Sequence, residues 1–156
     1  MKRALIIALA LFGQPALAAS INGTASVIDG DTIEVHGQRI RLHGIDSPEG
    51  RQTCDRNGKA WRCGTDAANA LDGLLGRSPV RCTQKDIDRY HRIVATCTVR
   101  GIDVNDWMVR NGWAVEYRHY SHAYDGAETE ARAARRGIWA SQFEMPWDWR
   151  KAQRQK

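Results

Sequence analysis

Alternating apolar and polar residues begin at about residue 23 and form three short segments that follow one another closely. The segments 23–28 and 32–35 flank the polar sequence Asp29-Gly30-Asp31, and Gly37 precedes a third segment at 39–42. A period of two is typical of strands with one buried face, whereas Asp-Gly pairs and single glycines favour tight turns. The pattern predicts three consecutive strands, a β-meander.

Apolar residues spaced three and four apart indicate helices further along the chain. Four such residues lie between positions 67 and 75 and are followed by a glycine, the usual helix stop. Two later segments show similar signals, one with an aspartate suited to cap a helix N-terminus. The predicted helices are 65–75, ended by Gly76; Asp103 to Asn111, ended by Gly112; and a last helix with Ala127, Ala131 and Ala134 on one side, ended by Gly137.

A hairpin is expected after the first helix. Its strands are predicted at 80–83 and 93–99, joined by a polar turn at 88–91. A register set by this turn places Ile87 opposite Arg92 and gives the two strands one shared apolar face.

The four cysteines allow three disulfide pairings. The hairpin register places Cys82 opposite Cys97, which leaves Cys54 to pair with Cys63. A zinc cluster formed by all four cysteines is the alternative. The paired C-x2-C spacing that is common in such clusters is missing, and an exported chain favours oxidation. We therefore predict two disulfides.

Five strands with a helix after the third match the order of a small Greek-key barrel of the oligonucleotide/oligosaccharide-binding (OB) type. The predicted fold class is α+β, a five-stranded OB barrel with three helices. We expect this domain to cover residues 19–142, followed by a Trp-rich, basic C-terminal tail at 143–156.

The first 18 residues have the pattern of a signal peptide. Lys2 and Arg3 precede an unbroken apolar run from Ala4 to Phe12, and Ala16-Leu17-Ala18 is a small-x-small cleavage signal. Nine apolar residues are too few for a membrane-spanning helix, which needs about 20. We expect cleavage after Ala18, export to the periplasm or the medium, and no membrane association afterwards.

Composition adds a mild preference for anionic partners. The formal net charge is +5, and removing the two positive charges of the signal peptide leaves +3. A basic domain of this size favours polyanions without specifying one, and extra positive charge is also compatible with solubility alone.

Nothing in the sequence indicates an oligomer, so we expect the protein to be a monomer.

Candidate chemistry is concentrated in three polar pieces. A phosphodiester resists attack because the nucleophile approaches an anionic phosphate, and a divalent cation together with guanidinium groups offsets that charge. Carboxylates supply the oxygen ligands that Ca²⁺ prefers, and a further carboxylate near the ion is able to orient or deprotonate water. The pieces are Asp29-Gly30-Asp31-Thr32, Arg41-Leu42-His43-Gly44-Ile45-Asp46-Ser47-Pro48-Glu49 and Asp88-Arg89-Tyr90-His91-Arg92.

These three pieces, with the closing Gly137-Ile138-Trp139, resemble the staphylococcal nuclease family from about Ala25 to Trp139. The resemblance implies Asp31, Asp46 and the Ser47 carbonyl as Ca²⁺ ligands, with Asp29 reaching the ion through water. It implies Glu49 as general base or water-positioning residue, Arg41 and Arg92 as phosphate-binding catalytic arginines, and Arg89 and Tyr90 as contacts to a terminal phosphate. It further implies cleavage of DNA or RNA at the 5′-oxygen, leaving 3′-phosphates.

Two departures from the family pattern bear on the site. His91 stands where the family commonly has Gly, which affects the placement of Arg92. The disulfide loop between Cys54 and Cys63 replaces a Lys-rich segment after Glu49.

Tyr117 and Tyr120 are expected at the mouth of the barrel, where a ring is able to stack on a base.

Two other functions are compatible with parts of the sequence. One is a non-catalytic OB module that binds single-stranded nucleic acid, and the other is a disulfide-stabilised interaction domain with a charged face. Neither requires Asp31, Asp46, Glu49 and both arginines together.

Overall fold

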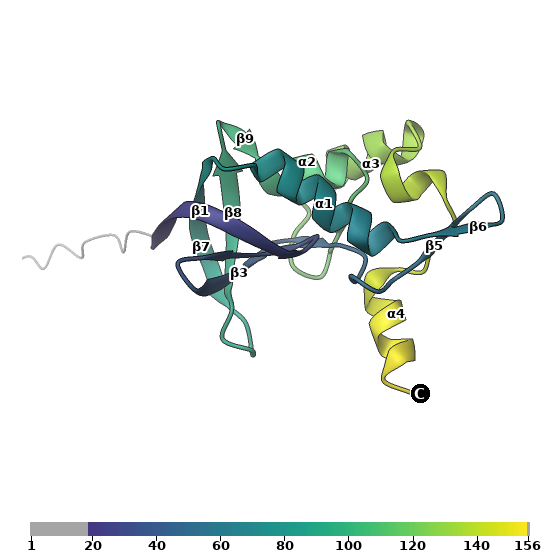
Figure 1. The fold of residues 1–156 in the computed structure, drawn as a ribbon, viewed down its shortest axis with the longest axis horizontal. Coiled ribbons are helices and arrows are strands. Elements are labelled where there is room, and N and C mark those ends of the chain that lie inside the picture. The colour runs from purple at the N-terminus through teal and green to yellow at the C-terminus, as the bar shows by residue number, and fades with distance from the viewer. Residues whose placement is uncertain (1–18, 156) are drawn as a thin grey trace, which may run out of the picture.

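The computed structural model describes residues 19–155, so the predicted signal peptide lies outside the described residues. Within these residues, six strands precede the first helix and helices close the chain, and Figure 1 labels most of these elements. The strands are β1 (Ser20–Asp29), β2 (Thr32–Val35), β3 (Gln38–Leu42), β4 (Ile45–Asp46), β5 (Cys54–Arg56), β6 (Lys59–Trp61), β7 (Pro79–Ile87), β8 (Ile93–Val99), β9 (Ile102–Asp103) and β10 (Val115–Glu116). The helices are α1 (Cys63–Leu75), α2 (Val104–Arg110), α3 (Asp125–Ala133), the 3-10 helix η1 (Gly137–Ala140) and α4 (Pro146–Gln153).

Five strands close into a barrel, which confirms the predicted α+β OB fold. The strand order is β3-β2-β1-β7-β8, and a parallel pairing of β3 with β8 closes the sheet. The short β9 pairs antiparallel with the end of β8, while β4 pairs with β10 outside the barrel. The residues described contain four α-helices rather than the three expected, because the C-terminal segment also forms one.

The barrel interior is apolar. Fully buried side chains from three barrel strands, such as Ile33, Ile40 and Val99, meet Leu71 of α1 and Met108 of α2 in one cluster. Burial of such side chains is the main favourable term in folding. Asp103 caps α2 as predicted, since its side chain accepts a hydrogen bond from the backbone N–H of Asp106.

The β7–β8 hairpin has the predicted register from Val80 opposite Val99 to Gln84 opposite Ala95, and not nearer the turn. Cys82 pairs with Cys97, but an irregularity between Gln84 and Asp86 shifts the remaining pairs by one residue. The predicted pairing of Ile87 with Arg92 is therefore wrong, and Ile87 lies opposite Ile93. A β-bulge adds one residue to one strand, and the alternation of apolar residues did not reveal it.

Two disulfides join the pairs that the hairpin register indicated, Cys54–Cys63 and Cys82–Cys97. Cys82–Cys97 lies within the barrel, between β7 and β8, and is called the barrel disulfide below. Disulfides are typical of proteins outside the cytoplasm. Among residues 19–155, no helix has the length and apolar character needed to cross a bilayer.

A second apolar cluster anchors the C-terminal segment. Cys54, Cys63, Val115 and Ile138 form its buried centre, and the aromatic and Met side chains of the C-terminal segment pack against it. Pro146 is buried at the first turn of α4, a position that suits proline because its missing N–H has no helical partner there. The segment predicted as a tail therefore contains a docked helix.

Candidate active site

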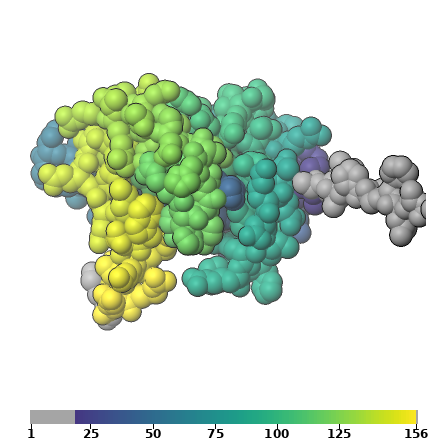
Figure 2. All heavy atoms as spheres, turned by 180° about the vertical axis from the view of Figure 1, so that it is seen from behind, coloured from purple at the N-terminus to yellow at the C-terminus, as the bar shows by residue number. Residues whose placement is uncertain are grey.

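A cleft of about 1000 Å³ lies between the β7–β8 hairpin and α4. Figure 2 shows the hollow between the teal-green hairpin and the yellow C-terminal helix. Polar and charged side chains from the β1–β2 turn, β3, the hairpin and α4 line it, together with the tyrosines of the loop after β10. Every residue proposed for the site from the sequence lines this cleft except Asp46.

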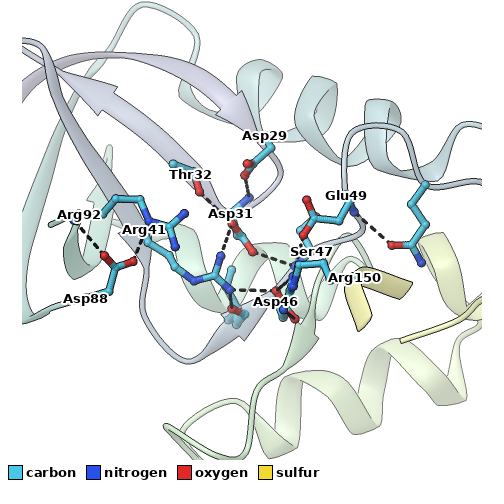
Figure 3. A network of polar contacts seen from close by, with 12 residues as sticks. Asp29, Asp31, Thr32, Arg41, Asp46, Ser47, Glu49, Asp88, Arg92 and Arg150 are labelled. Carbon is cyan, nitrogen blue, oxygen red and sulfur yellow. Dashed lines mark hydrogen bonds and ion pairs between the residues drawn. The ribbon is translucent and has the colours of Figure 1, made fainter. Parts of the chain in front are cut away.

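Arg41 bridges two buried carboxylates at the floor of the cleft (Figure 3). Its Nη1 donates to Asp31 Oδ1 at 2.8 Å and its Nη2 donates to Asp46 Oδ1 at 2.9 Å. The Asp31 and Asp46 side chains are 5% and 0% exposed. Burial opposes the charge on Arg41, but Asp31 and then Asp46 outweigh it and raise the arginine pKa. The arginine is therefore a fixed positive charge between two carboxylates.

The β1–β2 turn positions Asp31. Its carboxylate accepts hydrogen bonds from the Thr32 hydroxyl and from the Ser47 backbone N–H. Burial acts to raise the pKa of Asp31, but Arg41 and these hydrogen bonds outweigh it, so the pKa lies below its usual range. Burial, followed by the nearby charge of Asp31, raises the pKa of Asp29 to about 7. Near neutral pH Asp31 is therefore ionised, whereas Asp29 is close to the middle of its titration.

Asp46 lies on β4, which is outside the barrel sheet to which β1, β2 and β3 belong. Its backbone pairs with Val115 of β10, so the loop from β3 carries it across to a separate ladder. The next residue, Ser47, donates its hydroxyl to the Trp113 carbonyl and approaches the β1–β2 turn closely. A Cβ on Gly30 would lie 2.0 Å from Ser47 Oγ, so only glycine allows this approach.

Glu49 lies at the edge of the same floor, with its side chain 32% exposed. Its backbone N–H donates to Gln52 Oε1, and the amide of the fully buried Gln52 in turn donates to the Glu144 carbonyl. A Cβ on Gly64 would lie 1.7 Å from the Glu49 carbonyl oxygen, so the first turn of α1 fits against Glu49 only with glycine. These contacts fix the backbone from which Glu49 projects.

Arg150 of α4 is a site residue that the sequence analysis missed. Its Nη1 donates to Asp46 Oδ1 at 2.9 Å and to Glu49 Oε1 at 2.7 Å, and its Nη2 donates to Asp46 Oδ2 at 2.8 Å. The only signal in the sequence was the Pro146 start of a helix in the presumed tail. Nothing local indicates a contact across more than 100 residues.

Arg92 reaches the cleft from the hairpin. Its Nε donates to Asp88 Oδ2 at 2.7 Å, and its backbone N–H donates to Asp88 Oδ1. The turn between them places His91 at φ 61°, the left-handed region that favours glycine. The turn thus adopts at His91 the backbone that a glycine would take, and Asp88 holds the guanidinium.

The four residues predicted to contact substrate all line the cleft. Tyr90 is 63% exposed, and the Arg89 guanidinium lies over its ring at 4.9 Å. Tyr120 is equally exposed. Tyr117 instead stacks on Trp147 of α4, with centroids 5.2 Å apart and planes 11° from parallel. One face of Tyr117 is therefore already covered.

The oxygen donors suit a hard divalent cation, but the side chains are arranged around guanidiniums. Asp31, Asp46 and Glu49 all belong to one network, yet no three His, Cys, Asp or Glu side chains within residues 19–155 converge into a metal-binding group. Arg41 takes one oxygen of each aspartate and Arg150 takes both oxygens of Asp46. These oxygens would therefore suit a hard divalent cation only once Arg150 leaves Asp46.

An OB barrel with buried carboxylates, paired arginines and a basic cleft defines a phosphodiesterase of the nuclease class. The family described as "Staphylococcal nuclease homologue" matches residues 39–141, and the chain belongs to this family. Nucleases of this family are metal-dependent in general. The matched range ends before α4 and so does not include Arg150.

Three relatives cover most of the chain. A "Succinoglycan biosynthesis protein ExoI" from Rhizobium meliloti (strain 1021) is 42% identical over 90% of this chain and 76% of its own length. An "Uncharacterized endonuclease" from Escherichia coli is 35% identical over 96% of this chain and 98% of its own. A "Micrococcal nuclease" from Shigella flexneri is 34% identical over 88% and 84%.

Proposed function

We propose that the protein is an exported, Ca²⁺-dependent, sugar-nonspecific nuclease that hydrolyses DNA and RNA at the 5′-oxygen and leaves 3′-phosphates. The observation that carries this proposal is the bridge from Arg41 to Asp31 and Asp46, beside Glu49 and at the floor of a cleft that Arg92 also lines. Neither a binding module nor an inert interaction domain requires two buried carboxylates gripped by one guanidinium.

Each group has a distinct role in the proposed reaction. Asp31, Asp46 and the Ser47 carbonyl would hold the cation, and Asp29 would reach it through water. The cation would offset the charge of the phosphate. Arg41 and Arg92 bind the phosphate oxygens with their guanidinium forks as negative charge builds on them. Glu49 accepts a proton from water or orients it, because its carboxylate is partly exposed to the cleft.

Substrate contacts extend along the cleft. Arg89 and Tyr90 bind a terminal phosphate, and the exposed ring of Tyr120 stacks on a base. Tyr117 supports the wall through its stack on Trp147 and offers at most one face to a base. Phosphate contacts and stacking carry little sequence information, so the enzyme cuts with little base preference.

Export follows from the proposed signal peptide at 1–18, with a mature chain that starts near Ala19. The two disulfides are consistent with a protein outside the cytoplasm. We propose that the nuclease domain spans 19–142, that the 143–156 segment adds α4 to its cleft, and that the protein acts as a monomer.

Digestion of plasmid DNA and of RNA tests the function directly. We expect both polymers to be degraded with Ca²⁺ and both to survive with a chelator. The new 5′ ends should accept label from polynucleotide kinase without phosphatase treatment, because they are hydroxyls. Glu49→Gln should lower the rate by roughly 10²-fold or more, since it removes a group that acts on the nucleophile.

A matched control is Asp72→Asn, which neutralises an exposed carboxylate on α1 that does not line the cleft. Its rate should equal that of the wild type. Retained binding of single-stranded DNA with no cleavage under any cation would support the OB binding module instead.

A further inference from the structure

Arg150 covers Asp46 from the cleft side. Both oxygens of Asp46 accept hydrogen bonds from Arg150, and one of them also accepts from Arg41. Asp46 is fully buried and is the one predicted site residue that does not line the cleft, whereas Asp31, Glu49 and Arg150 all do. A cation that arrives from the cleft therefore meets the Arg150 guanidinium before it meets Asp46.

The helix that carries Arg150 is fixed to the rest of the site. Trp147 stacks on Tyr117, and Gln52 donates to the Glu144 carbonyl at 2.7 Å just before α4 begins. Pro146 is buried. These contacts hold the helix that carries Arg150, so the position of Arg150 does not depend on its ion pairs alone.

A divalent cation at Asp46 would compete with Arg150 for the same two oxygens. The Arg150 side chain is 30% exposed and Asp46 is 0% exposed, so their pairing is partly shielded from water. A guanidinium and a divalent cation are both attracted by the same two oxygens and repel each other. Arg41 reaches only Oδ1 of Asp46, so the other buried oxygen, Oδ2, has Arg150 as its only cationic partner among the described residues and would be left uncompensated unless a cation took its place.

We propose that Arg150 is an internal counter-cation of the site, which satisfies Asp46 and Glu49 in the metal-free protein and withdraws from Asp46 when a divalent cation binds. This inference rests on the proposed cation dependence. It makes α4 a positioning element of the active site, although the helix lies outside the matched family range. It also means that cation affinity is set partly by a residue that is not a ligand.

Removal of the competing charge should strengthen cation binding. Arg150→Gln keeps a polar, hydrogen-bonding side chain but removes the charge and shortens its reach. Its Ca²⁺ dissociation constant should fall roughly tenfold to a hundredfold, the scale of one charge-assisted hydrogen bond. Its thermal midpoint in chelator should fall, and the rise of that midpoint on adding Ca²⁺ should exceed the rise in the wild type.

The experiment is a Ca²⁺ titration by calorimetry of wild type, Arg150→Gln and Lys151→Gln, with folding checked by circular dichroism. Lys151 is exposed on the same helix, so its variant removes one positive charge without touching Asp46. We expect its affinity to change by less than about twofold, because an exposed charge at this distance is screened by salt.

Equal or weaker Ca²⁺ binding by Arg150→Gln, with normal wild-type binding, would refute the counter-cation role and leave the nuclease proposal standing. No Ca²⁺ binding by any of the three proteins would overturn both. If Arg150→Gln does not fold, the wild type provides the test. The Nε–H resonance of Arg150, assigned with Arg150→Lys, should shift along the Ca²⁺ titration, and an unchanged resonance would refute the proposal.

Discussion

Replacing Arg41 with Met would remove the charge between Asp31 and Asp46 while keeping most of the side-chain volume. Asp31 would lose its charged partner and keep the Thr32 hydroxyl and one backbone N–H. Asp46 would keep Arg150 on both oxygens. The change therefore leaves one buried carboxylate without a cation.

The magnitude follows from burial. Arg41 is 18% exposed and Asp31 is 5% exposed, so solvent screens their pair little. Removing one partner of a buried ion pair costs about 3–5 kcal/mol. The hydrogen bonds that remain on Asp31 place this variant at the lower end, so we expect a loss of about 3 kcal/mol near neutral pH in chelator.

The loss should depend on pH in a defined direction. In the wild type the folded-state pKa of Asp31 is lowered, so its stabilising effect is present above the unfolded pKa and is lost as the pH falls through the folded value. In the variant, burial is no longer outweighed and the pKa rises. Protonation then relieves the cost, so the stability difference should be smaller at about pH 5 than at about pH 8.

Urea unfolding followed by circular dichroism, in chelator and at both pH values, measures these differences. Arg39→Met is the control, because Arg39 is exposed on the same strand and forms no ion pair within residues 19–155. We expect it to stay within about 0.5 kcal/mol of the wild type. A difference below about 1 kcal/mol for Arg41→Met, or one that grows as the pH falls, would refute the electrostatic account.

Four further predictions concern the hairpin, α1 and the disulfides. Asp88→Asn should slow cleavage, because the arginine of the same turn loses its anchor. Burial acts to raise the pKa of Asp88 but hydrogen bonds from that turn outweigh it and lower the pKa, so the stability advantage of the wild type should be present above about pH 4 and vanish below it in acid unfolding curves. Gly64→Ala should displace the Glu49 backbone and lower both activity and thermal midpoint, and unchanged values would show that the close approach is not needed. Replacing both cysteines of the barrel disulfide with Ala should cost about 3 kcal/mol in urea unfolding, from the sequence separation of 15. Non-reducing mass spectrometry of the wild type should show a four-proton deficit, and free thiols would contradict both pairings.

Local signals predicted most of the barrel because strands, caps and turns depend on neighbouring residues. The strands 32–35 and 93–99 and the Asp103 cap fall where the sequence placed them. The hairpin register also indicated the Cys82–Cys97 pair. The bulge between Gln84 and Asp86 was not predicted, because one inserted residue changes the register of the strands without changing their composition.

The sequence by itself determined which groups are present: Asp31, Asp46 and Glu49 within one short span that also contains Arg41, Arg92 further along the chain, and an OB barrel to carry them. Only the tertiary structure decided which charges meet. Arg150 reaches Asp46 and Glu49 because Trp147 and Pro146 dock α4 against the cleft, and no periodicity or spacing reports such a contact. Ion pairing depends on distance and burial in space, and these are set by packing between segments far apart in the chain.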